Sequence, residues 1–309
     1  MCAKKSGVVV MLLCLSLIFC SCQKKGGSDF SKQITPSTEK GTWDNSIKVL
    51  KPTAPGTHTH SCDVATVDYT NAKEGYIVVD YSGTNKKVKL QITGSDNVTY
   101  TYDLHGKQEV FPLTSGSGNY NVGVYENISG TKYSPVLSVD INATITNEFG
   151  PYLYPNQYVD FNSQSLPVAK CKELSYYCNT DIEIVQSVYN YIIANFSYDY
   201  DKAESLPAGY LPVVDDIYNS NKGICFDYAA VMATMLRSQA IPTRLEVGYV
   251  EEAYHAWIST YIKNVGWVNG IIEFDGKSWK LMDPTYASTS DSPQDFLTED
   301  KKYITKFVY

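Results

Sequence analysis

The first part of the chain with a regular pattern has apolar residues at every second position. The pattern is clearest at Val88, Leu90 and Ile92, which alternate with polar side chains. Such alternation indicates half-buried strands, and clusters of Ser, Gly and Asn between the runs indicate turns. Strands are predicted at residues 76–81, 86–92, 98–104, 108–113, 120–125 and 133–141. Short strands at this spacing predict a β-sandwich, immunoglobulin-like in architecture, over residues 66–147. We interpret it as a spacer or packing module, with ligand binding as the alternative.

Helical periodicity replaces alternation after a connection at residues 149–158 that contains Pro and Tyr. Apolar residues recur at intervals of three and four in two segments, which predicts two helices, ending near Phe196 and Arg237. They are Ile184, Val188, Tyr191 and Ile192 in the first, and Cys225, Ala229, Met232 and Leu236 in the second. Strand-like runs follow at residues 245–249, 255–261, 271–274 and 278–282. Residues 148–309 are therefore predicted to form an α+β domain.

The first 22 residues predict the compartment. Lys4 and Lys5 precede an apolar run from Val8 to Phe19, which is too short for an ordinary membrane-spanning helix. A small residue, Cys22 and a polar stretch come next, with Cys20 as a competing acceptor. The segment resembles a bacterial lipoprotein signal peptide, in which the cysteine becomes the lipidated first residue. The resemblance implies lipid attachment at Cys22.

This leader predicts a protein anchored on the extracytoplasmic face of the cell membrane, with the membrane itself as one partner. Residues 23–65 are rich in Lys, Ser, Thr, Gly and Pro and are predicted to form a flexible linker. The formal net charge of -7 argues against nucleic acid as a partner.

Four cysteines remain once those of residues 1–22 are set aside. Cys171 and Cys178 would lie about 10 Å apart along a continuous helix, too far for a disulfide, so both are predicted to be buried thiols. Cys62 follows His58 and His60, which raises the alternative of a metal site. That cluster lacks a fourth ligand, so no metal and no cofactor are expected.

The fourth cysteine, Cys225, is predicted to stand in the first turn of the second helix. Gly223 permits the tight turn before that helix. The first backbone N–H groups of a helix have no partner within it, and the helix dipole favours negative charge there. A thiol at this point is biased toward thiolate, the nucleophilic form. A lone cysteine is more often a buried apolar residue, so this element alone decides nothing.

Three separated sequence blocks favour the catalytic interpretation: GICFDYA at 223–229, YHAW at 254–257 and MDPT at 282–285. They resemble those of the transglutaminase-like superfamily, whose fold is related to papain-like cysteine proteases. The resemblance implies a catalytic triad of Cys225, His255 and Asp283, which follow one another at spacings of 30 and 28 residues. One position departs from the family pattern. Ala240 stands where glycine is usual, which removes an easy left-handed helix cap.

The residue types define the expected chemistry. Cys225 would attack an amide carbonyl, His255 would shuttle the proton, and Asp283 would orient the imidazole. The expected function is a thiol enzyme acting on amide bonds of envelope proteins or peptides, as a cysteine protease or an acyl transferase. The alternative is a non-catalytic surface binding or scaffold module that retains the fold. Arg244 is predicted to make a structural ion pair, and Trp257, Trp267 and Trp279 to line the core or groove.

Overall fold

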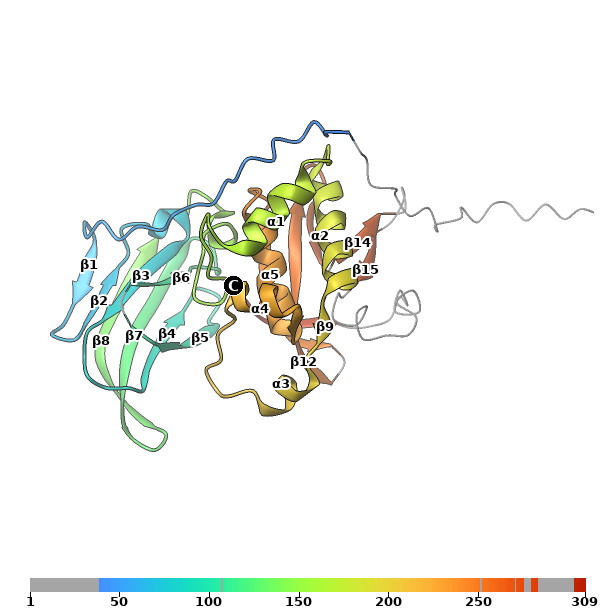
Figure 1. Ribbon diagram of the computed structural model, residues 1–309. Coiled ribbons are helices and arrows are strands. Elements are labelled where there is room, and N and C mark those ends of the chain that lie inside the picture. Colours follow the sequence, from blue (N-terminus) through green and yellow to red (C-terminus); the bar gives the residue numbers. More distant parts are fainter. Residues whose placement is uncertain (1–38, 107, 251, 270, 275–278, 283–302) are drawn as a thin grey trace, which may run out of the picture. The chain divides into compact units, whose positions relative to one another are not determined.

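The structure is a computed structural model that describes residues 39–309, except 107, 251, 270, 275–278 and 283–302. The side chains of residues 250, 269, 271–274 and 279–282 are also outside the description. Residues 38–309 form one compact unit (Figure 1). The predicted leader with Cys22, and Asp283, lie outside the described residues. Within the described part of the chain, no helix combines the length and the apolar character needed to cross a membrane.

Eight strands between residues 59 and 143 form two antiparallel four-stranded sheets. One has the order β1 (Thr59–Ser61), β2 (Ala65–Asp68), β3 (Tyr76–Tyr81), β6 (Glu109–Pro112). The other has the order β5 (Thr99–Leu104), β4 (Val88–Thr93), β7 (Gly118–Ser129), β8 (Lys132–Ala143). The chain crosses between the sheets after β3, β5 and β6, a pattern typical of immunoglobulin-like sandwiches. The structure thus confirms the sheet-rich N-terminal region and all six predicted strands; β1 and β2 were not predicted.

The alternating pattern directs one face of each sheet into a shared core. Val88, Leu90 and Ile92 are almost fully buried, and the rings of Tyr102 and Phe111 meet across the two sheets at 4.8 Å. Near the start of β7, the hydroxyl of Tyr120 donates to the main-chain oxygen of Gly116 at 2.6 Å. A tyrosine that bonds back to the preceding corner in this way fixes the crossover loop in immunoglobulin-like domains.

Residues 39–58 form no helix or strand, yet part of this segment is attached to the C-terminal region. The N–H of Gly41 donates to the main-chain oxygen of Tyr176 at 2.9 Å, and the N–H of Trp43 donates to that of Cys178 at 3.0 Å. The N–H of Lys48 donates to the main-chain oxygen of Ser238 at 2.8 Å. Main-chain hydrogen bonds at these distances hold an extended segment in one place. The segment expected to be a flexible linker up to residue 65 therefore includes hydrogen-bonded chain and β1.

The C-terminal part combines helices with a second antiparallel sheet, as expected for an α+β domain. The helices are α1 (Leu166–Ser175), α2 (Asp181–Asn195), α3 (Tyr200–Ser205), α4 (Val214–Ser220) and α5 (Cys225–Arg237). The sheet has the order β13 (Gly266–Asn269), β12 (Ala253–Ile262), β11 (Thr243–Val250), β16 (Tyr303–Val308). Two short pairs accompany it: β9 (Ser197–Tyr198) with β10 (Lys222–Gly223), and β14 (Ile271–Phe274) with β15 (Trp279–Met282).

Helix α5 is the central element of this region. It packs against β11 and β12 on one side and against α1, α2 and α4 on the others (Figure 1). Every side chain from Asp227 to Arg237 is buried. Alanine at 229, 230 and 233 leaves room for these neighbours to approach the helix backbone closely. The apolar stripe of the sequence predicted a helix with one buried face, whereas α5 is covered on all sides.

Arg237 fixes the C-terminal end of α5. Its guanidinium is 1% exposed and donates to the main-chain oxygens of Thr243, Tyr154 and Tyr309 at 2.8 to 3.0 Å. Burial lowers the pKa of Arg237 to about 9, so the group stays charged at neutral pH. One cation thus ties the end of α5 to the first residue of β11, to the connection after the sandwich and to the residue after β16.

Side-chain contacts bear on two further expectations. Cys171 and Cys178 are unpaired and buried, as predicted, although α1 ends at Ser175 and does not run continuously between them. The contacts described for Arg244 are aromatic, and the ion pair predicted for it stays a prediction. Its guanidinium lies over the ring of Trp267 at 3.7 Å and over that of Tyr152 at 4.8 Å. A guanidinium stacks well on aromatic faces, so these rings are suitable partners for it.

The strand near whose start His255 lies and the strand that ends before Asp283 have different partners. Strand β15 pairs with β14, its hairpin neighbour. Strand β12 pairs instead with β11 and, along Ser259–Ile262 only, with β13. Short hairpin partners form more readily than distant ones, which accounts for the β14–β15 pair. Among the described residues, the β13 side of β12 has no strand partner from Ala253 to Ile258.

Ala240 occupies the position for which the sequence lacks the usual glycine. Its φ is 58°, in the left-handed region. The N–H of Ile241 donates to the oxygen of Leu236 and the N–H of Ala240 to that of Arg237, at 3.1 and 2.9 Å. This pair of bonds is a Schellman motif, and a non-glycine residue at its left-handed position costs about 1 kcal/mol.

Replacing Ala240→Gly should raise the free energy of unfolding by about 1 kcal/mol, because glycine adopts a positive φ without the Cβ clash. Ala169→Gly is the matched control: Ala169 is equally exposed but lies within α1, where glycine should lower stability by about 1 kcal/mol. Urea unfolding of both variants measures the difference. Destabilisation by both substitutions would contradict the strain assigned to Ala240.

Candidate active site

Cys225 is the first residue of α5, as the sequence predicts. The residue before it, Ile224, is the N-cap and is extended, with φ -98° and ψ 176°. Cys225 is partly exposed and is not in a disulfide, whereas Cys171 and Cys178 are buried. Its position places the thiol beside the first N–H groups of the helix, where the dipole favours negative charge. The N–H of Cys225 itself is available there to a developing oxyanion.

Gly223 is needed just before this helix. A Cβ at position 223 would lie 2.7 Å from the Cβ of Asp227 and 2.9 Å from its carboxylate, closer than such atoms can approach. Asp227 is fully buried and accepts a hydrogen bond from the N–H of Ile224 at 2.9 Å. The glycine and the aspartate of the GICFDYA block therefore act together to set the turn that presents Cys225.

His255 lies near the start of β12, with its side chain 8% exposed. Its ring stacks 6.4 Å from that of Trp257, and its main chain pairs with Gly248 on β11. Any side chain at 248 would overlap the main-chain oxygen of Ile304 on β16, so glycine allows the three strands to pack here. The imidazole is thereby held in a buried position on a strand that α5 contacts directly.

Cys225 and His255 lie toward the same end of the packed pair α5 and β12. The opposite end is fixed by Arg237, which binds the oxygen of Thr243, and Thr243 pairs with Thr260 on β12. From that end, the 12 residues back to Cys225 span about 18 Å of helix. The five residues from Thr260 back to His255 span about 17 Å of strand. Because these two lengths match and α5 packs against β12, we expect the start of α5 and His255 to lie at the same end of the pair.

The third predicted residue, Asp283, lies directly after β15 and outside the described residues. The structure therefore brings together the elements of Cys225 and His255, and the position of Asp283 stays a prediction. On the other side of the histidine, Tyr254 is 60% exposed and its ring lies 5.4 Å from that of Tyr249. The histidine thus has an exposed aromatic pair on the same hairpin.

Sequence reasoning missed the partners of Asp227. Lys202 on α3 and Tyr210 in the following loop both bind its carboxylate at 2.6 Å. The available signal was Asp227 itself: a carboxylate predicted near a buried helix start requires a partner, since buried charges are paired in folded proteins. Its partners are about 20 residues earlier in the chain, and no periodic pattern marks them.

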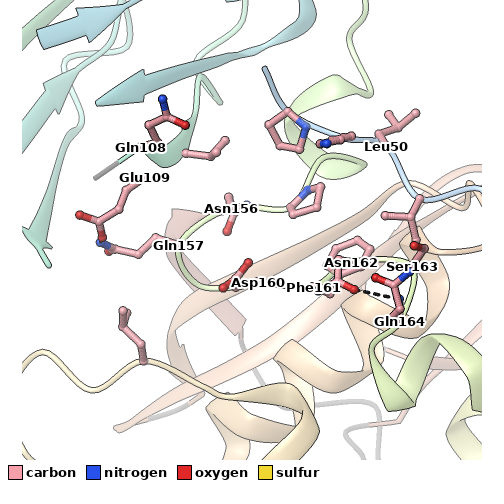
Figure 2. A pocket seen from close by; sticks show the side chains of 16 residues that line it. Leu50, Gln108, Glu109, Asn156, Gln157, Asp160, Phe161, Asn162, Ser163 and Gln164 are labelled. Atoms are coloured by element: carbon pink, nitrogen blue, oxygen red, sulfur yellow. Dashed lines mark hydrogen bonds between the residues drawn. The ribbon is translucent and has the colours of Figure 1, made fainter. Parts of the chain in front are cut away.

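A cavity of about 750 Å³ lies elsewhere in the molecule (Figure 2). It is lined by residues 49–52 of the N-terminal segment, 108–110 around β6, 155–157 and 160–164 of the connection, and Leu211. Burial raises the pKa of Asp160 on this lining. Neither Cys225 nor His255 is among the described residues that line the cavity.

A family model identifies the class of the domain. The model described as the transglutaminase-like superfamily matches residues 169–270, a segment that includes α5 with Cys225 and β12 with His255. This chain therefore contains a domain of the transglutaminase-like superfamily, which confirms the resemblance drawn from the three sequence blocks. No curated protein matches the chain.

Several solved structures are similar to the chain at low identity. One is a protein from Cytophaga hutchinsonii, described as a candidate cysteine protease, with a TM-score of 0.35, 14% identity and coverage of 74% of this chain and 69% of that one. The periplasmic domain of TgpA from Pseudomonas aeruginosa, bound to ethylmercury, has a TM-score of 0.34 and 17% identity. The match covers 76% of this chain and 77% of that one. Red sea bream transglutaminase has a TM-score of 0.28 and 13% identity, and the match covers 70% of this chain and 48% of that one. The assignment rests on the family model.

Proposed function

We propose that the protein is a cell-surface thiol enzyme that acts on amide bonds through Cys225, His255 and Asp283. The observation that most supports this is a partly exposed cysteine at the start of an otherwise largely buried helix that packs against β12, the strand of the buried His255. A structural cysteine requires neither the turn formed by Gly223 nor access to solvent.

In this mechanism the Sγ of Cys225 attacks the carbonyl carbon of a carboxamide or peptide bond. His255 removes the thiol proton and returns it to the leaving amine, and a thioester remains. The N–H of Cys225 stabilises the oxyanion, and Asp283 holds the imidazole through its second nitrogen. Water then releases a carboxylate, which makes the enzyme a hydrolase. A primary amine instead forms a new amide, which makes it an acyl transferase.

The compartment is part of the same proposal. Lipid attachment at Cys22 would hold the enzyme at the extracytoplasmic face of the membrane, where envelope proteins and peptides are the accessible amide substrates. The competing candidate is a surface scaffold that retains the fold without turnover, and the reactivity of Cys225 distinguishes the two.

Iodoacetamide should alkylate Cys225 at pH 6 about 100-fold faster than Cys62, an exposed thiol that serves as a reference within the same chain. The reason is that an imidazole-paired thiol remains largely thiolate at pH 6, whereas an ordinary thiol is less than about 1% thiolate. Peptide mass spectrometry over time measures both rates. His255→Ala should remove the advantage of Cys225. Equal rates at the two cysteines in the unmodified protein would favour the scaffold.

Hydrolysis and transfer are separated by incubating the protein with dansyl cadaverine and an extract of envelope proteins. Fluorescent labelling that is lost in Cys225→Ala and retained in Cys62→Ala indicates transfer, whereas new peptide amino termini with the same dependence indicate hydrolysis. Both activities require the thioester, so one variant abolishes either. Labelling or cleavage that persists in Cys225→Ala would exclude Cys225 as the nucleophile.

Cys22→Ala should move the protein from the membrane fraction to the soluble fraction, because the acyl chains supply the membrane affinity. Cys20→Ala is the matched control and should leave the protein in the membrane fraction. Fractionation followed by immunoblotting measures both. Release by the Cys20 substitution, or retention of the Cys22 variant, would contradict the assigned attachment site.

A further inference from the structure

The first turn of α5 contains a buried charge that the proposed reaction does not use. Asp227 is fully buried and lies two residues after Cys225. Its Oδ2 accepts from the ammonium of Lys202 at 2.6 Å and from the N–H of Ile224 at 2.9 Å. Its Oδ1 accepts from the hydroxyl of Tyr210 at 2.6 Å. The carboxylate is therefore fully satisfied, as a buried anion must be.

Both side-chain partners come from one segment. Lys202 belongs to α3, Tyr210 follows that helix, and the ammonium also donates to the Tyr210 hydroxyl at 2.6 Å. Burial, and then the hydrogen bond to Asp227, raise the pKa of Tyr210 far above its usual range, so the hydroxyl stays a donor. Asp199 caps α3 by accepting from the N–H of Lys202 at 3.1 Å. The segment is thus anchored on the helix that presents the thiol.

The ion pair between Lys202 and Asp227 affects Cys225 through the charge that surrounds its thiol. An unpaired carboxylate in the same helical turn would repel a thiolate and oppose the helix dipole. The ammonium of Lys202 cancels that charge at ion-pair distance. We propose that Lys202 is a positioning residue for Cys225: by pairing with Asp227 it fixes the first turn of α5 and keeps the surroundings of the thiol from becoming net negative. This rests on the proposed function for its purpose, but its electrostatic effect is measurable by itself.

Other charged groups near this cluster include Asp216 on α4, which packs against α5 and contributes to the raised pKa of Tyr210. Asp199 pairs with Lys222 at 3.0 Å, and both belong to the segments that flank β9 and β10. The hydrogen bond from the Lys202 N–H, and then Lys222, lower the pKa of Asp199. His255 faces α5 from β12, and Asp283 is predicted to accompany it. Among the ion pairs of the described residues, the Lys202–Asp227 pair alone combines a fully buried member with a place in the turn of Cys225.

The test is the pH dependence of alkylation of Cys225 by iodoacetamide, with Cys62 as the internal reference. Lys202→Met should move the pH of half-maximal rate upward by about one unit, because it leaves Asp227 unbalanced. Asp227→Asn should move it downward, because it leaves Lys202 unbalanced. The double variant, which removes both charges, should return the midpoint to within a few tenths of a unit of the original.

Two controls distinguish charge from structure. Lys202→Arg keeps the cation and should keep the midpoint. Lys222→Met removes a cation from the more exposed pair and should shift it by less than about 0.3 unit, because solvent screens that pair. If Lys202→Met does not fold, Asp227→Asn and the double variant still give the predicted opposite shift and its reversal.

An unchanged midpoint in both single variants would overturn the inference, and so would a shift that the double variant fails to reverse. Since a midpoint can be measured for a slow thiol as well as a fast one, these outcomes are independent of the proposed function. If Cys225 of the unmodified protein is no more reactive than Cys62, the proposed enzymatic function is refuted. The effect of the Lys202–Asp227 pair on the Cys225 thiol is still tested by the same variants.

Discussion

The close packing of α5 against β12 is the contact on which the candidate site depends. Cys225 and His255 are 30 residues apart in the chain, and they are expected at one end of this pair because the helix from Arg237 back to Cys225 and the strand from Thr260 back to His255 span similar lengths. The alanines of α5 make the approach possible, and Gly248 on β11 lets the neighbouring strand β16 pair closely beside it in the sheet. A larger residue at any of these positions would move the histidine relative to the thiol.

Buried charge fixes α5 at both ends. Arg237 binds three main-chain oxygens at one end, and Asp227 binds Lys202, Tyr210 and the N–H of Ile224 at the other. Such groups are costly to bury and gain little net stability, but they tolerate few alternative arrangements. They define the register of the helix, which hydrophobic contacts alone would leave less well defined. The exposed cysteine at the start of an otherwise buried helix is a consequence of that register.

The sequence predicted the strands of the sandwich and the helix at Cys225 well, because alternation and helical periodicity reflect burial directly. The family resemblance marked Ala240 as the position that lacks the usual glycine, and the left-handed conformation is nevertheless kept there. Sequence reasoning missed β16, which pairs with β11 from far along the chain, and the Lys202–Asp227 pair, because long-range partners leave no local pattern. It also missed the stacking of Arg244 on Tyr152 and Trp267, because these rings come from separate parts of the chain.

The central claim is geometric, and a crystal structure of the protein measures it most directly. The quantity is the distance from the Sγ of Cys225 to the nearer ring nitrogen of His255. The account predicts about 3 to 4 Å, with the Asp283 carboxylate within hydrogen-bonding reach of the second nitrogen. A separation beyond about 7 Å, with the imidazole turned toward another partner, would contradict it.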